Sequence, residues 1–146
     1  MKIVVDSNIL VSAILNKESN IAQFLILGKE RFSFYAPELL KLEIERHKVK
    51  LMEIAKLSIL DFESLQALLY ECLIFVPEEQ IPFKYWHDAL PIVRDVDPDD
   101  IAFVALSEFL GARLWTGDKK LLKGMYDRGY ESGITTEKLL HIWLAS

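Results

Sequence analysis

Cysteine is almost missing from this sequence of 146 residues, because Cys72 is the only one. A lone cysteine cannot form an intrachain disulfide, and no His or second Cys stands near it at the spacing of a metal site. Long hydrophobic runs are missing too: the longest, such as 101–106, fall far short of the about 20 residues that a membrane-spanning helix needs. Asp6 interrupts the N-terminal segment too early for a signal peptide. We therefore expect a cytoplasmic protein with a buried thiol and no membrane attachment.

An excess of positive charge is also missing. Lys and Arg number 17 against 22 for Asp and Glu, which gives a net charge of −5 at pH 7. The chain therefore has no global positive field that would draw it to nucleic acid or to an anionic membrane surface. Any polyanion that it handles must be held by a local site.

Apolar and charged residues are present in the proportions of a folded protein, at 51% and 27%. The sequence contains no repeat, linker or low-complexity segment, so we expect one globular domain over residues 1–146. Short β-branched or alternating apolar segments predict strands at 1–5, 31–36, 73–77, 112–116 and 134–135, with helices between them. This alternation predicts an α/β fold, a three-layer α/β/α sandwich with a mainly parallel central sheet.

Individual residues give local predictions within this pattern. Pro37 is expected in the first turn of a helix, because its missing N–H costs nothing there. Pro91 should kink or end any helix that forms over 83–93. Gly111 should close a buried helix over 101–110, and Thr136 should cap the last helix.

Acidic residues follow two of the expected strands. Asp6 ends the first strand and Asp118 follows the strand at 112–116, so both are expected at the edge of the sheet where ligands bind in open parallel folds. Asp100 begins a helix that can face the same crevice. Glu43 reaches it only if its own helix runs away from that edge.

Clustered carboxylates need protons or cations. At separations of about 5 Å, each pair would repel by about 3 kcal/mol at an effective dielectric constant near 20. Oxygen ligands without Cys or His favour Mg²⁺ or Mn²⁺ over zinc, and such an ion can bind phosphate oxygens and activate water against a phosphodiester. Basic residues expected beside the crevice, and candidates for binding nucleic acid, are Lys119, Lys120, Arg46 and Lys48.

Three segments together resemble the PIN domain, the metal-dependent ribonuclease fold of many VapC-like toxins of toxin–antitoxin pairs. The first runs from Asp6 through Asn8 to Ala13, the second is 37–43, and the third is 97–122, which contains Asp-Pro-Asp-Asp and Thr-Gly-Asp-Lys-Lys. Each motif alone is short, but their order and spacing are specific and cover nearly the whole chain. Ser7 stands where the family usually has Thr, and both supply a hydroxyl.

The resemblance implies a function and a set of site residues. The family's metal-binding and catalytic acids fall on Asp6, Glu43, Asp100 and Asp118, with Asn8 and Asp97 in support, and the third ligand is either Asp100 or Asp97. The implied activity is Mg²⁺- or Mn²⁺-dependent hydrolysis of single-stranded RNA. Implied partners are RNA, an antitoxin protein if the chain is a toxin, and a second copy of the chain in a homodimer.

Simpler interpretations stay open at this point. The segments 6–8 and 97–100 have the composition of ordinary turns and helix caps, and Glu43 could merely pair with His47 one helical turn away. The same fold could serve as a catalytically weak module that binds RNA or a partner. An aspartyl-phosphate protein is a third class, although Asn8 occupies the position where that chemistry wants a second acid.

Overall fold

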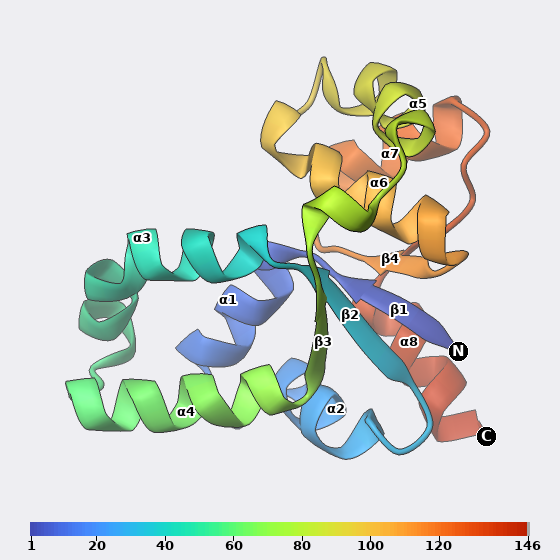
Figure 1. Ribbon diagram of the computed structural model, residues 1–146. Helices are drawn as coiled ribbons and strands as arrows, with labels where there is room; N and C mark the ends of the chain where they lie inside the picture. Colours follow the sequence, from blue (N-terminus) through green and yellow to red (C-terminus); the bar gives the residue numbers. More distant parts are fainter. Residues whose placement is uncertain (146) are drawn as a thin grey trace.

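Five parallel strands form the centre of the protein in the computed structural model, which describes residues 1–145 (Figure 1). The strands lie in the order β3-β2-β1-β4-β5. Their bounds are β1 Lys2–Val5, β2 Ser33–Pro37, β3 Leu73–Val76, β4 Arg113–Trp115 and β5 Gly133–Ile134. The helices are α1 Ser7–Leu15, α2 Asn20–Gly28, α3 Leu39–Ala55, α4 Ile59–Glu71, α5 Phe83–Val93, α6 Ile101–Leu110, α7 Lys119–Asp127 and α8 Thr136–Ala145, with short 3₁₀ helices η1 Glu78–Gln80 and η2 Pro98–Asp100.

Helices cover both faces of this sheet, which confirms the predicted three-layer α/β/α fold. Helix α6 packs directly on β1, β2 and β4, with α5 beside it and α7 against α5. On the other face α1 contacts α2, α3 and α4, and α2 contacts α8. Figure 1 shows these two groups of helices on opposite sides of the strands. The direction of the connections reverses after β3, as in other doubly wound sheets.

The core is densely apolar at the middle of the sheet. Ile3, Val4 and Val5 of β1 are buried, as expected for a strand covered on both faces. Phe24 of α2 packs edge-on against Phe34 and against Trp115, with ring centroids 5.4 Å apart in both pairs. Such aromatic contacts fix the position of β4 relative to β1 and β2, and with it the edge where the strands end.

Two local predictions differ from the structure at prolines. Pro37 is the last residue of β2 rather than part of a helix, and α3 begins two residues later. Helix α5 continues through Pro91 to Val93, so the proline lies inside the last turn and does not end the helix. Pro91 has no N–H to donate to the carbonyl four residues earlier, but the helical bonds resume beyond it, because the backbone N–H of Arg94 donates to the carbonyl of Leu90 at 3.0 Å.

The helix boundaries otherwise follow local chemistry. Gly111 ends the buried helix α6 with φ of 63°, a left-handed conformation that glycine adopts without steric cost. The cap of α8 is Thr135 rather than Thr136, because the Thr135 hydroxyl accepts the N–H of Lys138 at 3.2 Å. Cys72 is buried, as predicted. No helix within residues 1–145 is long and apolar enough to span a bilayer.

Candidate functional site

Asp6 lies at the carboxyl end of β1, where the strand order reverses between β1 and β4. Only 1% of its surface is exposed, and its carboxylate caps α1 by accepting the N–H of Ser7 at 2.8 Å. Its other oxygen, Oδ2, accepts the hydroxyl of Thr116 at 2.6 Å and Nδ2 of Asn8 at 3.3 Å. A carboxylate buried to this extent is therefore held by directed donors rather than by water.

Thr116 and Asn8 connect the ends of β1 and β4. The Thr116 hydroxyl donates to Asp6 and accepts both the Asp118 N–H at 3.0 Å and Nδ2 of Asn8 at 3.3 Å. Asn8 Oδ1 accepts the N–H of Gly117 at 3.2 Å. These bonds use the full hydrogen-bonding capacity of the hydroxyl and fix the position of Asp118 relative to Asp6.

Asp118 begins α7 at the same edge. Its Oδ1 accepts the N–H groups of Lys120 and Leu121 at 2.9 and 3.1 Å, so it caps the helix. Its charge and that of Asp97 raise the pKa of Asp6, after the larger effect of burial, while the bonds from Thr116 and Ser7 lower it. The strand ends thus place two carboxylates close enough to interact across the crevice.

Asp100 lies where several negative charges converge. Its pKa is raised to about 7, first by burial and then by the charges of Asp6, Asp97, Asp118 and Glu43, in that order. Asp97 itself caps η2 by accepting the Asp99 N–H at 3.0 Å. The charges of four neighbouring carboxylates thus meet at Asp100 and add to the effect of its burial.

Glu43 faces this group from α3. The helix starts after β2 and therefore runs away from the same edge of the sheet, which is the condition under which Glu43 was expected to reach the crevice. Burial raises the pKa of Glu43, and the charges of Asp6 and Asp99 raise it further, whereas a hydrogen bond with the Ser7 side chain and the charge of Arg46 lower it. Ser7 thus connects α1 to α3 inside the site.

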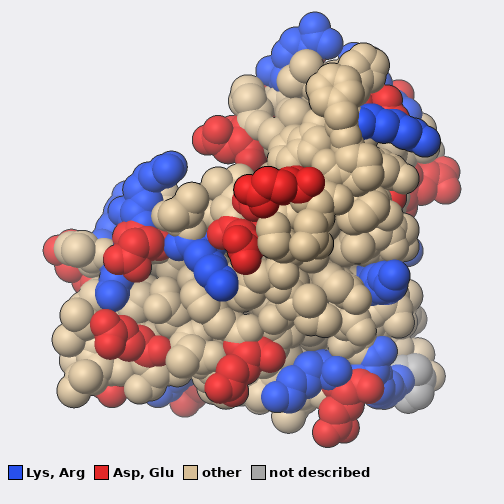
Figure 2. All heavy atoms as spheres, viewed as in Figure 1, with Lys and Arg blue, Asp and Glu red and all other residues tan. Residues whose placement is uncertain are grey.

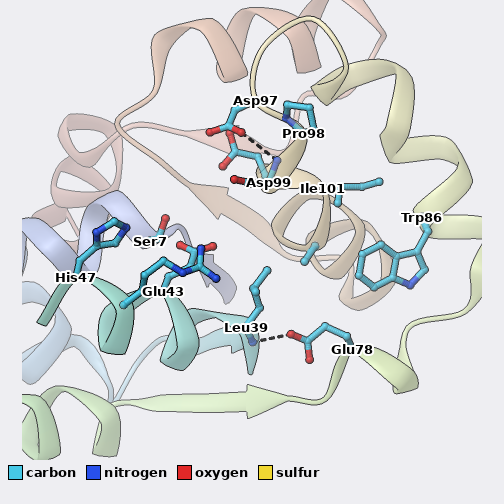
Figure 3. Close-up of a pocket in the computed structure, with 13 residues that line it drawn as sticks. Ser7, Leu39, Glu43, His47, Glu78, Trp86, Asp97, Pro98, Asp99 and Ile101 are labelled. Atoms are coloured by element: carbon cyan, nitrogen blue, oxygen red, sulfur yellow. Dashed lines mark hydrogen bonds between the residues drawn. The ribbon is translucent and has the colours of Figure 1, made fainter.

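Glu43, Asp97 and Asp100 line a cleft of about 480 Å³ between α3 on one side and α5, η2 and α6 on the other (Figure 3). Asp6 and Asp118 are not among the residues that line it. Its lining consists of Ser7, Leu39, Glu43, Arg46, His47, Glu78, Trp86, Asp97, Pro98, Asp99, Asp100, Ile101 and Ala102. Figure 2 shows acidic side chains at the centre of this face of the molecule, with basic side chains over α3 beside them. The cleft is therefore acidic in its interior and basic at one rim.

Comparison with known proteins identifies the family. The sequence profile of the PIN domain matches residues 4–139. The chain belongs to the PIN domain family. No protein of curated function matches the sequence at a significant level.

Solved structures show the same fold for this PIN domain. A chain of VapBC2 from Rickettsia felis, in a crystal structure with a DNA fragment from the promoter, superposes with a TM-score of 0.70 at 14% identity, covering 92% of this chain and 98% of that one. PAE2754 from Pyrobaculum aerophilum superposes with a TM-score of 0.63 at 18% identity, covering 100% and 91%. The fold prediction and the resemblance stated from sequence are thereby confirmed.

The donor set of this PIN domain fits a hard divalent cation. The side chains gathered at the cleft offer carboxylate oxygens and the Ser7 hydroxyl, which are ligands for Mg²⁺ or Mn²⁺. A cation bound there would also offset the carboxylate charges that, after the larger effect of burial, raise the pKa of Asp100. Within residues 1–145, however, no three acidic, His or Cys side chains are arranged closely enough to hold an ion without moving.

The predicted basic residues differ in their positions. Arg46 lines the cleft, and Lys119 and Lys120 are exposed on the first turn of α7 beside Asp118. Lys48 lies on the opposite side of α3, where its Nζ forms an ion pair with Glu63 of α4 at 3.3 Å. Lys48 is therefore tied to the helix hairpin rather than to the cleft.

Sequence reasoning missed two features of the site. Thr116 was expected only as the end of the strand at 112–116, although its hydroxyl lies beside the end of β1 and donates to Asp6. Glu78 was given no role from the sequence, whereas its Oε1 accepts the N–H of Leu39 at 2.6 Å and caps α3 from a distant segment. No sequence signal connects residues 39 and 78, because only the pairing of β2 with β3 brings them together.

Proposed function

We propose that this PIN domain is a metal-dependent ribonuclease that hydrolyses phosphodiester bonds of single-stranded RNA, with residues 1–146 acting as a single nuclease domain. The observation that carries the proposal is the convergence of Asp6, Asp97, Asp118 and Glu43 on Asp100, whose charges add to the larger effect of burial in raising the pKa of Asp100 to about 7. A structural ion-pair network would add basic partners to these acids. Arg46 acts on Glu43, but no basic group within residues 1–145 offsets the charges that act on Asp100, so a divalent cation would be their counter-charge.

The proposed ligands are Asp6, Glu43, Asp100 and Asp118. A bound Mg²⁺ or Mn²⁺ would activate water and offset the charge of the phosphodiester. Asp6 is held rigidly by Thr116 and Asn8, so it would act as the fixed ligand. Asp118 has one oxygen occupied as a helix cap, which leaves the other free to orient water or metal.

The remaining roles follow from position. Asp97 is close enough to influence both Asp6 and Asp100, so we assign it a supporting role next to the third ligand. Arg46 at the cleft and Lys119 and Lys120 beside Asp118 would contact RNA phosphates. Lys48 would contribute less, because Glu63 already neutralises it.

We further propose that the protein acts in the cytoplasm as the toxin of a toxin–antitoxin pair. Support comes from the PIN domain match and from the fold shared with a chain of the Rickettsia felis VapBC2 structure. In this proposal an antitoxin covers the acidic cleft and keeps RNA out. A homodimer is proposed from the exposed apolar side chains of the helices next to the sheet, such as Leu15 and Leu27.

One observation favours a second candidate, a catalytically weak module that binds RNA or a protein partner. Within residues 1–145, the acids are not grouped so that any three could ligate an ion as they stand. On this alternative the carboxylates would serve as a docking surface and the cation would bind poorly. Calorimetry with Mn²⁺ separates the two proposals, because no binding at millimolar concentration would favour the module.

The direct test is cleavage of single-stranded RNA in the presence of Mn²⁺ by the wild type and by Asp6→Asn, which removes a ligand charge and keeps the shape. The matched control is Asp61→Asn, because Asp61 is an exposed aspartate of α4 outside the cleft. We expect cleavage by the wild type and the control and a loss of at least about a hundredfold in Asp6→Asn. Equal cleavage by all three proteins would refute the assignment.

A further inference from the structure

One end of the cleft is built differently from the end that holds Ser7 of α1 and Glu43 of α3. Figure 3 shows Trp86 and Glu78 at the end away from Ser7 and His47. Leu39 and Ile101 line the wall beside them. Apolar surface, one aromatic ring and one carboxylate thus occupy the same part of a cleft whose other part carries the metal-binding candidates.

We propose that this end of the cleft binds one unpaired nucleobase of the RNA, and that Glu78 selects bases that carry an exocyclic amino group. The inference rests on the proposed function for its placement, because a base bound here would belong to a nucleotide near the phosphate at Asp100. It adds a specificity-determining residue, Glu78, and a stacking residue, Trp86. Adenine, cytosine and guanine would be accepted, and uracil would be disfavoured.

Trp86 has the features of a stacking platform. Its side chain points into the cleft, and its Nε1 donates to the carbonyl of Ile81 at 3.1 Å. This bond restricts rotation of the ring, so stacking of a base on it costs little side-chain conformational entropy. Every base has an aromatic face, so stacking on Trp86 would supply affinity without sequence preference.

Glu78 supplies the preference. Its Oε1 is anchored by the Leu39 N–H at 2.6 Å, whereas its Oε2 has no hydrogen-bond partner within the part of the chain that the structure describes. A carboxylate oxygen only accepts, so it pairs with the amino N–H of adenine, cytosine or guanine. Uracil offers only its N3–H, which lies between two carbonyl oxygens that the carboxylate repels. The same negative charge repels phosphate, so this end of the cleft suits a base rather than the RNA backbone.

The test measures binding of labelled single-stranded oligoribonucleotides of adenosine, cytidine or uridine by fluorescence anisotropy, with Ca²⁺ as the cation. Variants are Glu78→Gln and, as the matched control, Glu79→Gln, which removes the charge of an exposed neighbour that does not line the cleft. In Glu78→Gln the carbonyl oxygen can keep the Leu39 N–H while the amide N–H₂ faces the base. We expect the wild type and the control to bind the adenosine and cytidine oligomers about tenfold more tightly than the uridine oligomer.

Glu78→Gln should lose or reverse this preference, because an amide donor suits uracil. Equal affinity of the wild type for the three oligomers, or an unchanged preference in Glu78→Gln, would overturn the proposal. Binding is read without cleavage, so discrimination by a protein that fails to cut RNA with Mn²⁺ would refute the nuclease proposal and leave this one standing.

Trp86 is tested by a second pair of variants. Trp86→Phe and Trp86→Leu both lose the bond to Ile81, but only Phe keeps an aromatic face. We expect Trp86→Leu to bind every oligomer about tenfold more weakly than Trp86→Phe. Thermal unfolding of both variants verifies that they are folded. Equal affinities of two folded variants would contradict stacking.

Discussion

Thr116 Oγ1 donates a hydrogen bond of 2.6 Å to Asp6 Oδ2, although 110 positions separate the two residues along the chain. Both side chains are buried at the point where β1 and β4 end. The same hydroxyl accepts the N–H of Asp118 at 3.0 Å. One threonine therefore holds two of the proposed metal ligands in a fixed relationship, before any cation is bound.

Thr116→Val should destabilise the protein. Valine has the shape of threonine but removes the donor to Asp6 and the acceptor for the Asp118 N–H, leaving buried polar groups unpaired. We expect the free energy of unfolding to fall by about 1–3 kcal/mol at pH 7, measured by urea denaturation. Thr116→Ser keeps the hydroxyl and should lose much less. A valine variant as stable as the serine variant would show that the hydroxyl has no structural role.

Asp100 predicts how stability depends on pH in the absence of metal. Its pKa of about 7 in the folded protein lies above the value of about 3.9 in an unfolded chain. Between these pH values the folded state binds more protons than the unfolded state, so stability falls as pH rises from about 4 to about 7. The metal-free protein should be more stable at pH 5 than at pH 8.

Asp100→Asn tests this dependence, because asparagine cannot ionise. With metal removed by chelation, the variant should be more stable than the wild type at pH 8 by about 1–2 kcal/mol, a discounted value because Asp100 is partly exposed to solvent. Part of the slope should persist, since the pKa values of Asp6 and Glu43 are raised as well. A variant with the full pH dependence of the wild type would contradict the prediction.

Binding of Mn²⁺ should also depend on pH through Asp100. The carboxyl must lose its proton before it can ligate an ion, so binding releases a proton when the pH is at or below about 7. Calorimetry at pH 6 and pH 7 should show affinity about fivefold lower at the more acidic pH. The ratio should shrink in Asp100→Asn, together with a loss of overall affinity. Affinity independent of pH in the wild type would count against Asp100 as a ligand.

Arg46 and Lys48 give a matched pair for RNA binding. Arg46 lines the cleft, whereas Lys48 is paired with Glu63 at 3.3 Å on the other side of α3. In an Asp6→Asn background that prevents cleavage, Arg46→Ala should weaken RNA binding and reduce the slope of log affinity against log salt by about 0.7. Lys48→Ala should change both quantities less. A larger effect of Lys48→Ala would indicate that RNA binds on the α4 side of α3 and would contradict binding at the cleft.

The sequence was sufficient for much of the fold because its signals are local. Apolar composition predicts both the strand over Lys2–Val5 and the buried helix over Ile101–Leu110. Gly111 ends this helix at the predicted residue. Pro91 misled the prediction because α5 packs against α6 and α7, and these contacts outweigh the one backbone hydrogen bond that a proline removes. Propensity describes a residue's average environment, not its place within one helix.

The site was less accessible from sequence, because it depends on contacts between distant segments. The acids Asp6 and Asp118 could be placed at one edge from strand order alone, since parallel strands end together. Glu43 could not be placed at this edge from strand order, because its distance from the other acids depends on the direction of α3. The links made by Thr116 to Asp6 and by Glu78 to Leu39 have no local signature, as each joins residues that only the folded sheet brings together.

The most direct measurement is anomalous X-ray diffraction from crystals soaked in Mn²⁺. It reports the presence of the ion, its ligands and their number in one experiment. The prediction is an anomalous peak within ligand distance of Asp6, Asp100 and Asp118, with side chains that have moved toward it. Well-ordered crystals that were soaked in Mn²⁺ and show no anomalous peak between these carboxylates would contradict the proposed metal centre.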